Sequence, residues 1–262
     1  MNEINKQQVK QAFATYVEAY NAKDEKVKLK IDHTYRVADL CERIAKEEGM
    51  NDTDVRIAWL CGMLHDVGRF EQLRRYNTFN DAESVDHAAL GVQILFDDGK
   101  LADYLENADE QFCTFIRRVI SCHSMYRVPE DYTDREKCFA DILRDADKID
   151  ILKVNVEVPL EEIYNVTTQD LRNAEVTKEV MESFSEQHAT LRSLKKTSVD
   201  HVVGHISLVY ELVYSCSLRI VVEQGYLEKL MHFESHNPVT MQQFDTLRKM
   251  MQSYVDECLN KQ

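Results

Sequence analysis

Residues that break helices are scarce in this chain. Only 7 glycines and 3 prolines occur in 262 residues, and these two residue types break helices most strongly. Between them, apolar residues recur at three- and four-residue intervals, as in the stripe of Phe13, Tyr16, Val17 and Tyr20. The sequence therefore predicts an all-α protein.

Composition narrows the possible environments and partners. The chain is 44% hydrophobic and carries a formal net charge of -14. This charge argues against a nucleic-acid polymer or an anionic membrane as partner, and no apolar run approaches the ~18 residues of a membrane span. A small phosphorylated substrate remains compatible, because bound divalent cations reverse the local sign. Seven unpaired-looking cysteines and a polar N-terminus without a signal peptide predict a cytoplasmic protein with reduced thiols.

The pattern predicts a helical core over residues 1–157 and a helical C-terminal extension over 158–262. No linker rich in Gly, Pro or Ser separates them. In the core, Asp32 is the expected N-cap of a helix that follows a charged connector, and Thr133 with Glu136 fits a capping box. The extension is expected to hold three helices, over residues 169–187, 199–224 and 239–259.

A His-Asp pair closes an apolar helix in the core. His65 is followed by Asp66 and then by Gly68, which is expected to end the helix in the left-handed conformation. Adjacent residues point about 100° apart on a regular helix, but at a helix end both can turn inward. Imidazole and carboxylate side by side are good ligands for a divalent metal. A chance dipeptide is the alternative for the pair alone.

Four further helices each place one polar residue on an apolar stripe. These residues are His33, His87, His123 and Asp147. One such residue would be a hydrogen-bonded core residue, since an unpaired buried polar group costs about 1–3 kcal/mol. Four of them, together with His65 and Asp66, indicate one common site. Such a set can hold two metal ions with one bridging carboxylate.

This pattern resembles the HD-domain superfamily of metal-dependent phosphohydrolases. The order His…His-Asp…Asp maps onto His33, His65, Asp66 and Asp147 over residues 31–152, with Asp145 and Asp150 as competitors for the last position. The segments around His87 and His123 resemble the additional histidine segments of binuclear members. Those members include HD-type diadenosine tetraphosphate hydrolases and HD-GYP cyclic dinucleotide phosphodiesterases, although the Gly-Tyr-Pro signature of the latter is absent. The resemblance implies an HD-domain helical bundle.

The resemblance also implies a cofactor and site roles. Two divalent ions (Fe, Mn, Mg, Ni or Zn) would be held by His33, His65, Asp66, His87, His123 and Asp147, with Asp66 as the bridge. A metal-activated hydroxide would attack a nucleotide or another small phosphate ester or anhydride. Arg69 and Lys148 are the candidate phosphate-binding cations, with a surface ion pair as the alternative for Arg69.

Two other functions fit the same ligands. Diiron oxygenases of this fold, such as myo-inositol oxygenase, use the same six-ligand set on small hydroxylated or phosphonate substrates. A non-catalytic HD sensor or binding module is the third possibility. Basic residues near the site (Arg69, Arg74, Arg75 and Lys148) suit phosphate and so favour the hydrolase, although an oxygenase with a phosphonate or polyol substrate could use them as well. The sequence leaves the oligomeric state and the exact substrate open.

Overall fold

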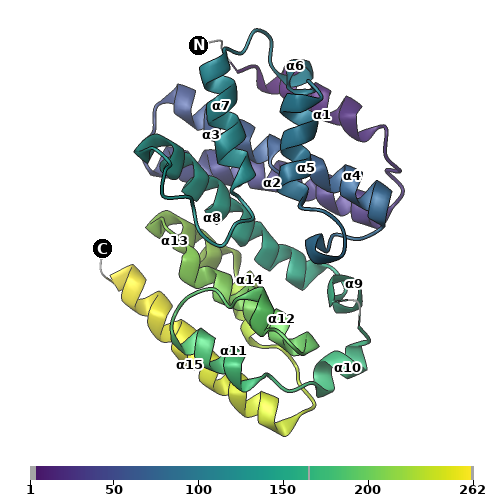
Figure 1. The fold of residues 1–262 in the computed structure, drawn as a ribbon. Helices are drawn as coiled ribbons and strands as arrows, with labels where there is room; N and C mark the ends of the chain where they lie inside the picture. Colours follow the sequence, from purple (N-terminus) through teal and green to yellow (C-terminus); the bar gives the residue numbers. More distant parts are fainter. Residues whose placement is uncertain (1–3, 165, 261–262) are drawn as a thin grey trace. The chain divides into compact units, whose positions relative to one another are not determined.

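The computed structural model describes residues 4–164 and 166–260. Every regular element in these residues is a helix and none is a strand, which confirms the predicted all-α class (Figure 1). None of the helices in this described part combines the length and apolar character needed to cross a bilayer.

The chain divides into two compact units, residues 1–147 (the N-terminal unit) and 148–262 (the C-terminal unit). The sequence predicts a boundary at 157/158, at the end of helix α8 (Asp134–Glu157), whereas the units divide inside this helix. A continuous helix that serves both units leaves no change of composition at the division. The extent of the functional domain stays a prediction.

The N-terminal unit is organised around helix α3 (Asp52–Leu64), in which every residue from Ile57 to Leu64 is buried. Helices α1, α2 and α7 pack on it, α4 packs on α5, and α5 packs on α7. A helix that is apolar on all sides belongs at the centre of a bundle. The remaining elements of this unit are α1 (Lys6–Val17), α2 (Glu25–Glu47), α4 (Val67–Tyr76), η1 (Asp81–Glu83), α5 (His87–Val92), the π-helical η2 (Gln93–Asp97), α6 (Leu101–Tyr104), α7 (Glu110–Ser121) and the first part of α8.

Local signals set several helix starts as expected. The capping box at the start of α8 is present, because Thr133 N–H donates to Glu136 and Glu136 N–H donates to Thr133 Oγ1. The expected start at Asp32 is wrong. Helix α2 begins eight residues earlier, with Asp24 as N-cap, and the charged stretch before Asp32 is its first two turns. Only Val27 is buried in these turns, so they carry no continuous apolar stripe.

Gly68 has a different role from the one expected. It lies in the first turn of α4 and has no positive φ. A Cβ at this position would lie 2.1 Å from the carbonyl oxygen of His87 and 2.6 Å from the amide nitrogen of Gly91. Glycine is therefore required because α4 and α5 cross here with their backbones in contact. This crossing brings His87 towards the His65-Asp66 junction.

The C-terminal unit is built from shorter helices than expected. Only the last of the three predicted helices is continuous, as α15 (Pro238–Asn260). The first is split into α10 and α11, where Asp200 accepts hydrogen bonds from the amide and hydroxyl of Thr177. The elements here are α9 (Leu160–Tyr164), α10 (Thr168–Asn173), α11 (Lys178–Ser185), η3 (Arg192–Leu194), α12 (Ser198–Ile206), η4 (Ser207–Glu211), α13 (Ser215–Gln224), α14 (Tyr226–Met231) and α15.

Candidate metal centre

The six side chains predicted as metal ligands lie together in the N-terminal unit. They come from α2, the α3–α4 junction, the first residue of α5, the residue after the C-cap of α7, and α8. They are His33, His65, Asp66, His87, His123 and Asp147, and we call them the His-Asp cluster. All except Asp147 are at most 6% exposed, and the Asp147 side chain is 17% exposed. The structure brings these six side chains together, whereas their role as metal ligands stays a prediction.

Asp66 lies between two pairs of histidines. Its Oδ2 is 3.5 Å from His33 Nε2 and 3.6 Å from His65 Nε2. Its Oδ1 is 3.5 Å from His87 Nε2 and 3.6 Å from His123 Nε2. Each carboxylate oxygen therefore serves its own pair, and the cluster has two halves that share one residue.

Asp147 completes the first half only. Its Oδ1 lies 3.2 Å from His33 Nε2 and 3.9 Å from His65 Nε2. The competing Asp145 and Asp150 are both buried and have partners of their own. The first half thus offers two imidazoles and two carboxylates, and the second offers two imidazoles and one carboxylate.

Hydrogen bonds at Nδ1 orient the imidazoles of His65, His87 and His123. His65 Nδ1 lies 2.6 Å from Gly62 O, and His123 Nδ1 lies 2.7 Å from Ile120 O. A carbonyl only accepts hydrogen bonds, so both nitrogens carry the proton. His87 Nδ1 donates in the same way to Asp81 Oδ2 at 2.7 Å. In the neutral rings, every one of these Nε2 atoms then presents a lone pair to the cluster.

The donor set fits a cation better than it fits any internal hydrogen bond. Burial lowers the pKa of both His65 and His87 to about 4, so these rings are neutral near pH 7. His87 Nε2 and His123 Nε2 are nevertheless only 3.0 Å apart, with both Nδ1 protons already used. These two nitrogens are therefore placed to bind one cation that lies beside both of them. Divalent transition metals bind such imidazole nitrogens.

The carboxylates of the cluster are ionised. Burial alone would raise the pKa of Asp66, but the nearby Lys30, His65, His123 and Arg69 outweigh it and hold this pKa well below its usual value. Burial opposes the ionised form of Asp147 as well, and the imidazoles around it lower its pKa. The cluster therefore presents two anionic carboxylates beside the neutral rings of His65 and His87, and carboxylates and neutral imidazoles are the forms that bind a divalent metal.

A second layer of polar side chains fixes His87. Asp81 accepts from His87 through Oδ2, and its Oδ1 accepts from Arg69 Nη1 at 2.9 Å and from Gln72 Nε2 at 2.8 Å. Burial raises the pKa of Asp81, but the opposing effect of His87 and Arg69 is larger and brings this pKa down to about 2. Sequence reasoning missed Asp81 because it lies in the three-residue helix η1, which is too short to show helical periodicity.

Two cations flank Asp66. Lys30 Nζ donates to Asp66 Oδ2 at 2.8 Å, and Arg69 Nε lies 3.6 Å from Asp66 Oδ1. Both cations also lie near the Phe79 ring, at 5.5 Å for Lys30 and 5.8 Å for Arg69. Lys30 was not predicted, although it precedes His33 by three residues and so shares its helix face.

The other predicted cations point elsewhere. Lys148 Nζ donates to the carbonyl of Glu211 at 3.1 Å, within the C-terminal unit. Arg74 and Arg75 both pair with Glu71. A substrate role for Lys148 stays a prediction.

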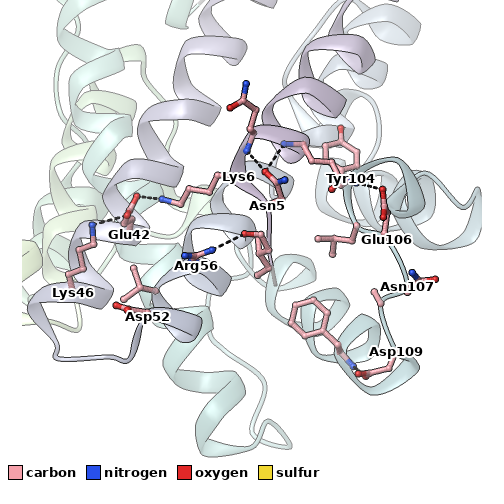
Figure 2. A pocket seen from close by; sticks show the side chains of 17 residues that line it. Asn5, Lys6, Glu42, Lys46, Asp52, Arg56, Tyr104, Glu106, Asn107 and Asp109 are labelled. Atoms are coloured by element: carbon pink, nitrogen blue, oxygen red, sulfur yellow. Dashed lines mark hydrogen bonds and ion pairs between the residues drawn. The ribbon is translucent and has the colours of Figure 1, made fainter. Parts of the chain in front are cut away.

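A separate groove lies elsewhere on the N-terminal unit (Figure 2). Its volume is about 900 Å³, and it is lined by the start of α1, parts of α2 and α3, and residues 104–109. At its edge, Glu42 of α2 pairs with Lys6 of α1 and with Lys46 of its own helix. No residue of the His-Asp cluster lines this groove, so it is not part of the candidate metal centre.

Comparison with known proteins agrees with the cluster. Residues 31–152 match the family model described as "HD domain". A 67-residue stretch is 33% identical to a Vibrio cholerae protein named "3'3'-cGAMP-specific phosphodiesterase 1", covering 24% of this chain and 16% of that protein. The chain thus aligns with about one sixth of this relative's length. No solved structure matches the chain.

Proposed function

We propose that this chain, whose residues 31–152 belong to the HD domain family, is a metal-dependent phosphohydrolase that acts on a nucleotide or another small phosphate ester or anhydride. One observation carries the proposal. The two oxygens of a single buried carboxylate, Asp66, face two separate pairs of imidazole nitrogens. A carboxylate in this position can bridge two cations.

The ligand roles follow from the two halves of the cluster. In the proposal, His33, His65, Asp147 and Asp66 Oδ2 hold one ion, and His87, His123 and Asp66 Oδ1 hold the other. Imidazole-rich sets favour iron, manganese, nickel or zinc over magnesium, which prefers oxygen ligands. When bound, such ions lower the pKa of a coordinated water towards 7 and neutralise charge on phosphate oxygens.

The protein side chains would supply the remaining parts of the site. The low pKa of Asp66 keeps this residue anionic, so it can hold its position between the histidine pairs. Asp81 keeps the His87 ring in the tautomer that presents Nε2. Lys30 and Arg69 place positive charge on both sides of Asp66, where they would bind phosphate oxygens of the substrate.

The similarity to a named phosphodiesterase supports a nucleotide as substrate. The printed name of that relative states that it acts on 3'3'-cGAMP, a cyclic dinucleotide. The aligned part is short, so we carry over the chemistry, hydrolysis of a phosphate ester, and leave the particular nucleotide to experiment.

All seven cysteines are free thiols, in keeping with our expectation of a reducing, cytoplasmic compartment.

The test is a substrate screen on protein loaded with manganese or iron under anaerobic conditions. The panel contains nucleoside mono-, di- and triphosphates, dinucleoside polyphosphates and cyclic dinucleotides, with phosphate release and chromatography as readouts. Asp66→Asn is the matched inactive variant, since it keeps the side-chain volume. We expect turnover of at least one nucleotide without oxygen uptake.

An oxygen electrode runs beside the screen with polyols and phosphonates. Oxygen uptake that depends on one of these compounds, with no hydrolysis of any nucleotide, would replace the hydrolase by the oxygenase. Tight nucleotide binding without any turnover would favour the sensor.

A further inference from the structure

Arg144 is a buried arginine on α8, three residues before Asp147 in the chain, and its side chain does not belong to the cluster. It is 7% exposed. Its guanidinium donates to the backbone carbonyls of Cys122 at 3.0 Å, His123 at 3.4 Å, Met125 at 2.5 Å and Tyr126 at 3.1 Å. All four acceptors belong to one segment, residues 122–126.

The partners of Arg144 show what it does for the fold. No carboxylate among the described residues pairs with it, and its hydrogen bonds go to main-chain oxygens only. Burial of a charge costs several kcal/mol unless it is compensated, and charge-assisted hydrogen bonds provide that compensation here. An aliphatic side chain would fill the same space without this cost. The specific effect of the arginine is therefore to fix the path of residues 122–126.

This segment carries one member of the cluster, and no helix holds it. Helix α7 ends at Ser121, so His123 lies beyond its regular hydrogen bonds. The residues that follow are open to solvent, with Met125 45% and Tyr126 39% exposed. Within residues 122–126, the main-chain bond from Met125 N–H to Cys122 O supplies local support. Tertiary support comes from the packing of buried Cys122 against Tyr132 and Ala140 and from the four bonds to Arg144, which reach as far as Tyr126.

The His123 ring bonds to Ile120 O, but the main chain of the other three histidines lies within a helix or directly next to one. His33 lies inside the 23-residue helix α2, and His65 directly follows α3. His87 opens α5 and is held by Asp81. His123 is thus the member of the cluster whose main-chain position depends most on one distant side chain.

We infer that Arg144 is a positioning residue for the second half of the cluster, the half formed by Asp66 Oδ1, His87 and His123. It holds His123 at Asp66, so the ion bound by this half depends on Arg144 much more than the ion bound by His33, His65 and Asp147. The inference rests on the proposed function in one respect, the binding of two divalent ions.

The test compares Arg144→Met with a matched control, Arg118→Met. Arg118 ties the far end of the same α7–α8 connection, donating to the carbonyl and carboxylate of Asp131 at 3.2 and 2.9 Å. Mn²⁺ binding is measured at defined free metal by plasma mass spectrometry, and electron paramagnetic resonance distinguishes a coupled ion pair from an isolated ion. We expect two ions in the wild type and in Arg118→Met. In Arg144→Met we expect the second ion to bind ~10–100-fold more weakly, with the uncoupled six-line spectrum of one Mn²⁺ per chain.

A second variant covers the case in which Arg144→Met fails to fold, as judged by circular dichroism. Arg144→Lys keeps the charge but cannot reach all four carbonyls, and we expect at least tenfold weaker binding of the second ion with the first ion retained. Unchanged affinity for both ions in either folded variant would overturn the inference while leaving the proposed function intact. Equal weakening of both ions would show a general structural role and would also overturn it. A wild type that binds fewer than two ions would overturn the binuclear part of the proposed function and this inference together.

Discussion

Removal of the Asp66 carboxylate tests the centre of the proposed site. In Asp66→Ala, both oxygens that face the two histidine pairs are lost, and so is the 2.8 Å ion pair with Lys30. Without metal, the main loss is one charge-assisted hydrogen bond, about 1.5–3 kcal/mol. Because the Lys30 side chain is only 17% exposed, water solvates the freed ammonium poorly and the loss lies towards the upper limit.

The effect on metal binding is distinct from the effect on folding. A metal at 100 times its Kd stabilises the native state by about 2.7 kcal/mol. For a chain of this size, that corresponds to roughly 5–11 °C in Tm. Wild-type protein should show such a shift with Mn²⁺, and Asp66→Ala should show little or none, since neither half of the cluster keeps its shared anion.

The assay is thermal unfolding with and without Mn²⁺, together with metal analysis after dialysis and turnover of the best substrate. Lys30→Met is the control, because it removes the same ion pair and keeps the carboxylate. We expect Lys30→Met to retain the Mn²⁺-induced shift. An equal shift in Asp66→Ala and wild type, or an Asp66→Ala variant with full metal content and turnover, would refute the bridging role.

Four further outcomes are expected. Arg69→Ala should raise KM for a phosphorylated substrate, measured by steady-state kinetics, and should also weaken metal binding through the loss of Asp81 anchoring. Asp81→Asn should lower metal affinity ~10–100-fold in a metal titration, because His87 loses its charged partner. Gly68→Ala should lower the apo-protein Tm, since its Cβ would lie 2.1 Å from a backbone oxygen. Burial lowers the pKa of Lys195 to about 8. Below pH 8 this side chain is charged in both the folded and the unfolded protein, so the cost of burying its charge is largest there. Lys195→Met should therefore stabilise the protein in chemical denaturation at pH 7, and this gain should shrink as the pH rises from 8 to 10.5.

Part of the convergence of the candidate ligands was predictable, because His33 and Asp147 follow helix geometry. His33 shares a buried face of α2 with Val37 and Ile44, and this face is visible as a stripe in the sequence. The stripe of Phe139, Leu143 and Asp147 likewise selects Asp147 over Asp145 and Asp150. The structure places its carboxylate 3.2 Å from His33. Buried polar residues on such stripes need partners, and this requirement points to a shared site.

The residues that hold the cluster in place were not predictable, because their roles depend on tertiary contacts and not on helix periodicity. Asp81 and Arg144 act through contacts between segments that are distant in sequence or very short, and no periodicity marks them. Lys30 was hidden within a charged stretch that resembles a connector. Gly68 was assigned to a helix end from local rules, but its role depends on the approach of α5. Tertiary contacts decided each of these positions.

The structure also changes which basic side chains favour the hydrolase proposal over the oxygenase alternative. Arg74 and Arg75 pair with Glu71, so the preference now depends on Lys30 and Arg69, which flank Asp66. With the carboxylates of Asp66, Asp81 and Asp147 ionised, these two cations leave a formal charge of about -1 in the metal-free site, and two divalent ions would change it to about +3. A phosphate ester or anhydride gains directly from this field, and so would an anionic phosphonate, whereas a neutral polyol does not. The charge balance around the cluster, more than the ligand set itself, therefore favours a phosphorylated substrate.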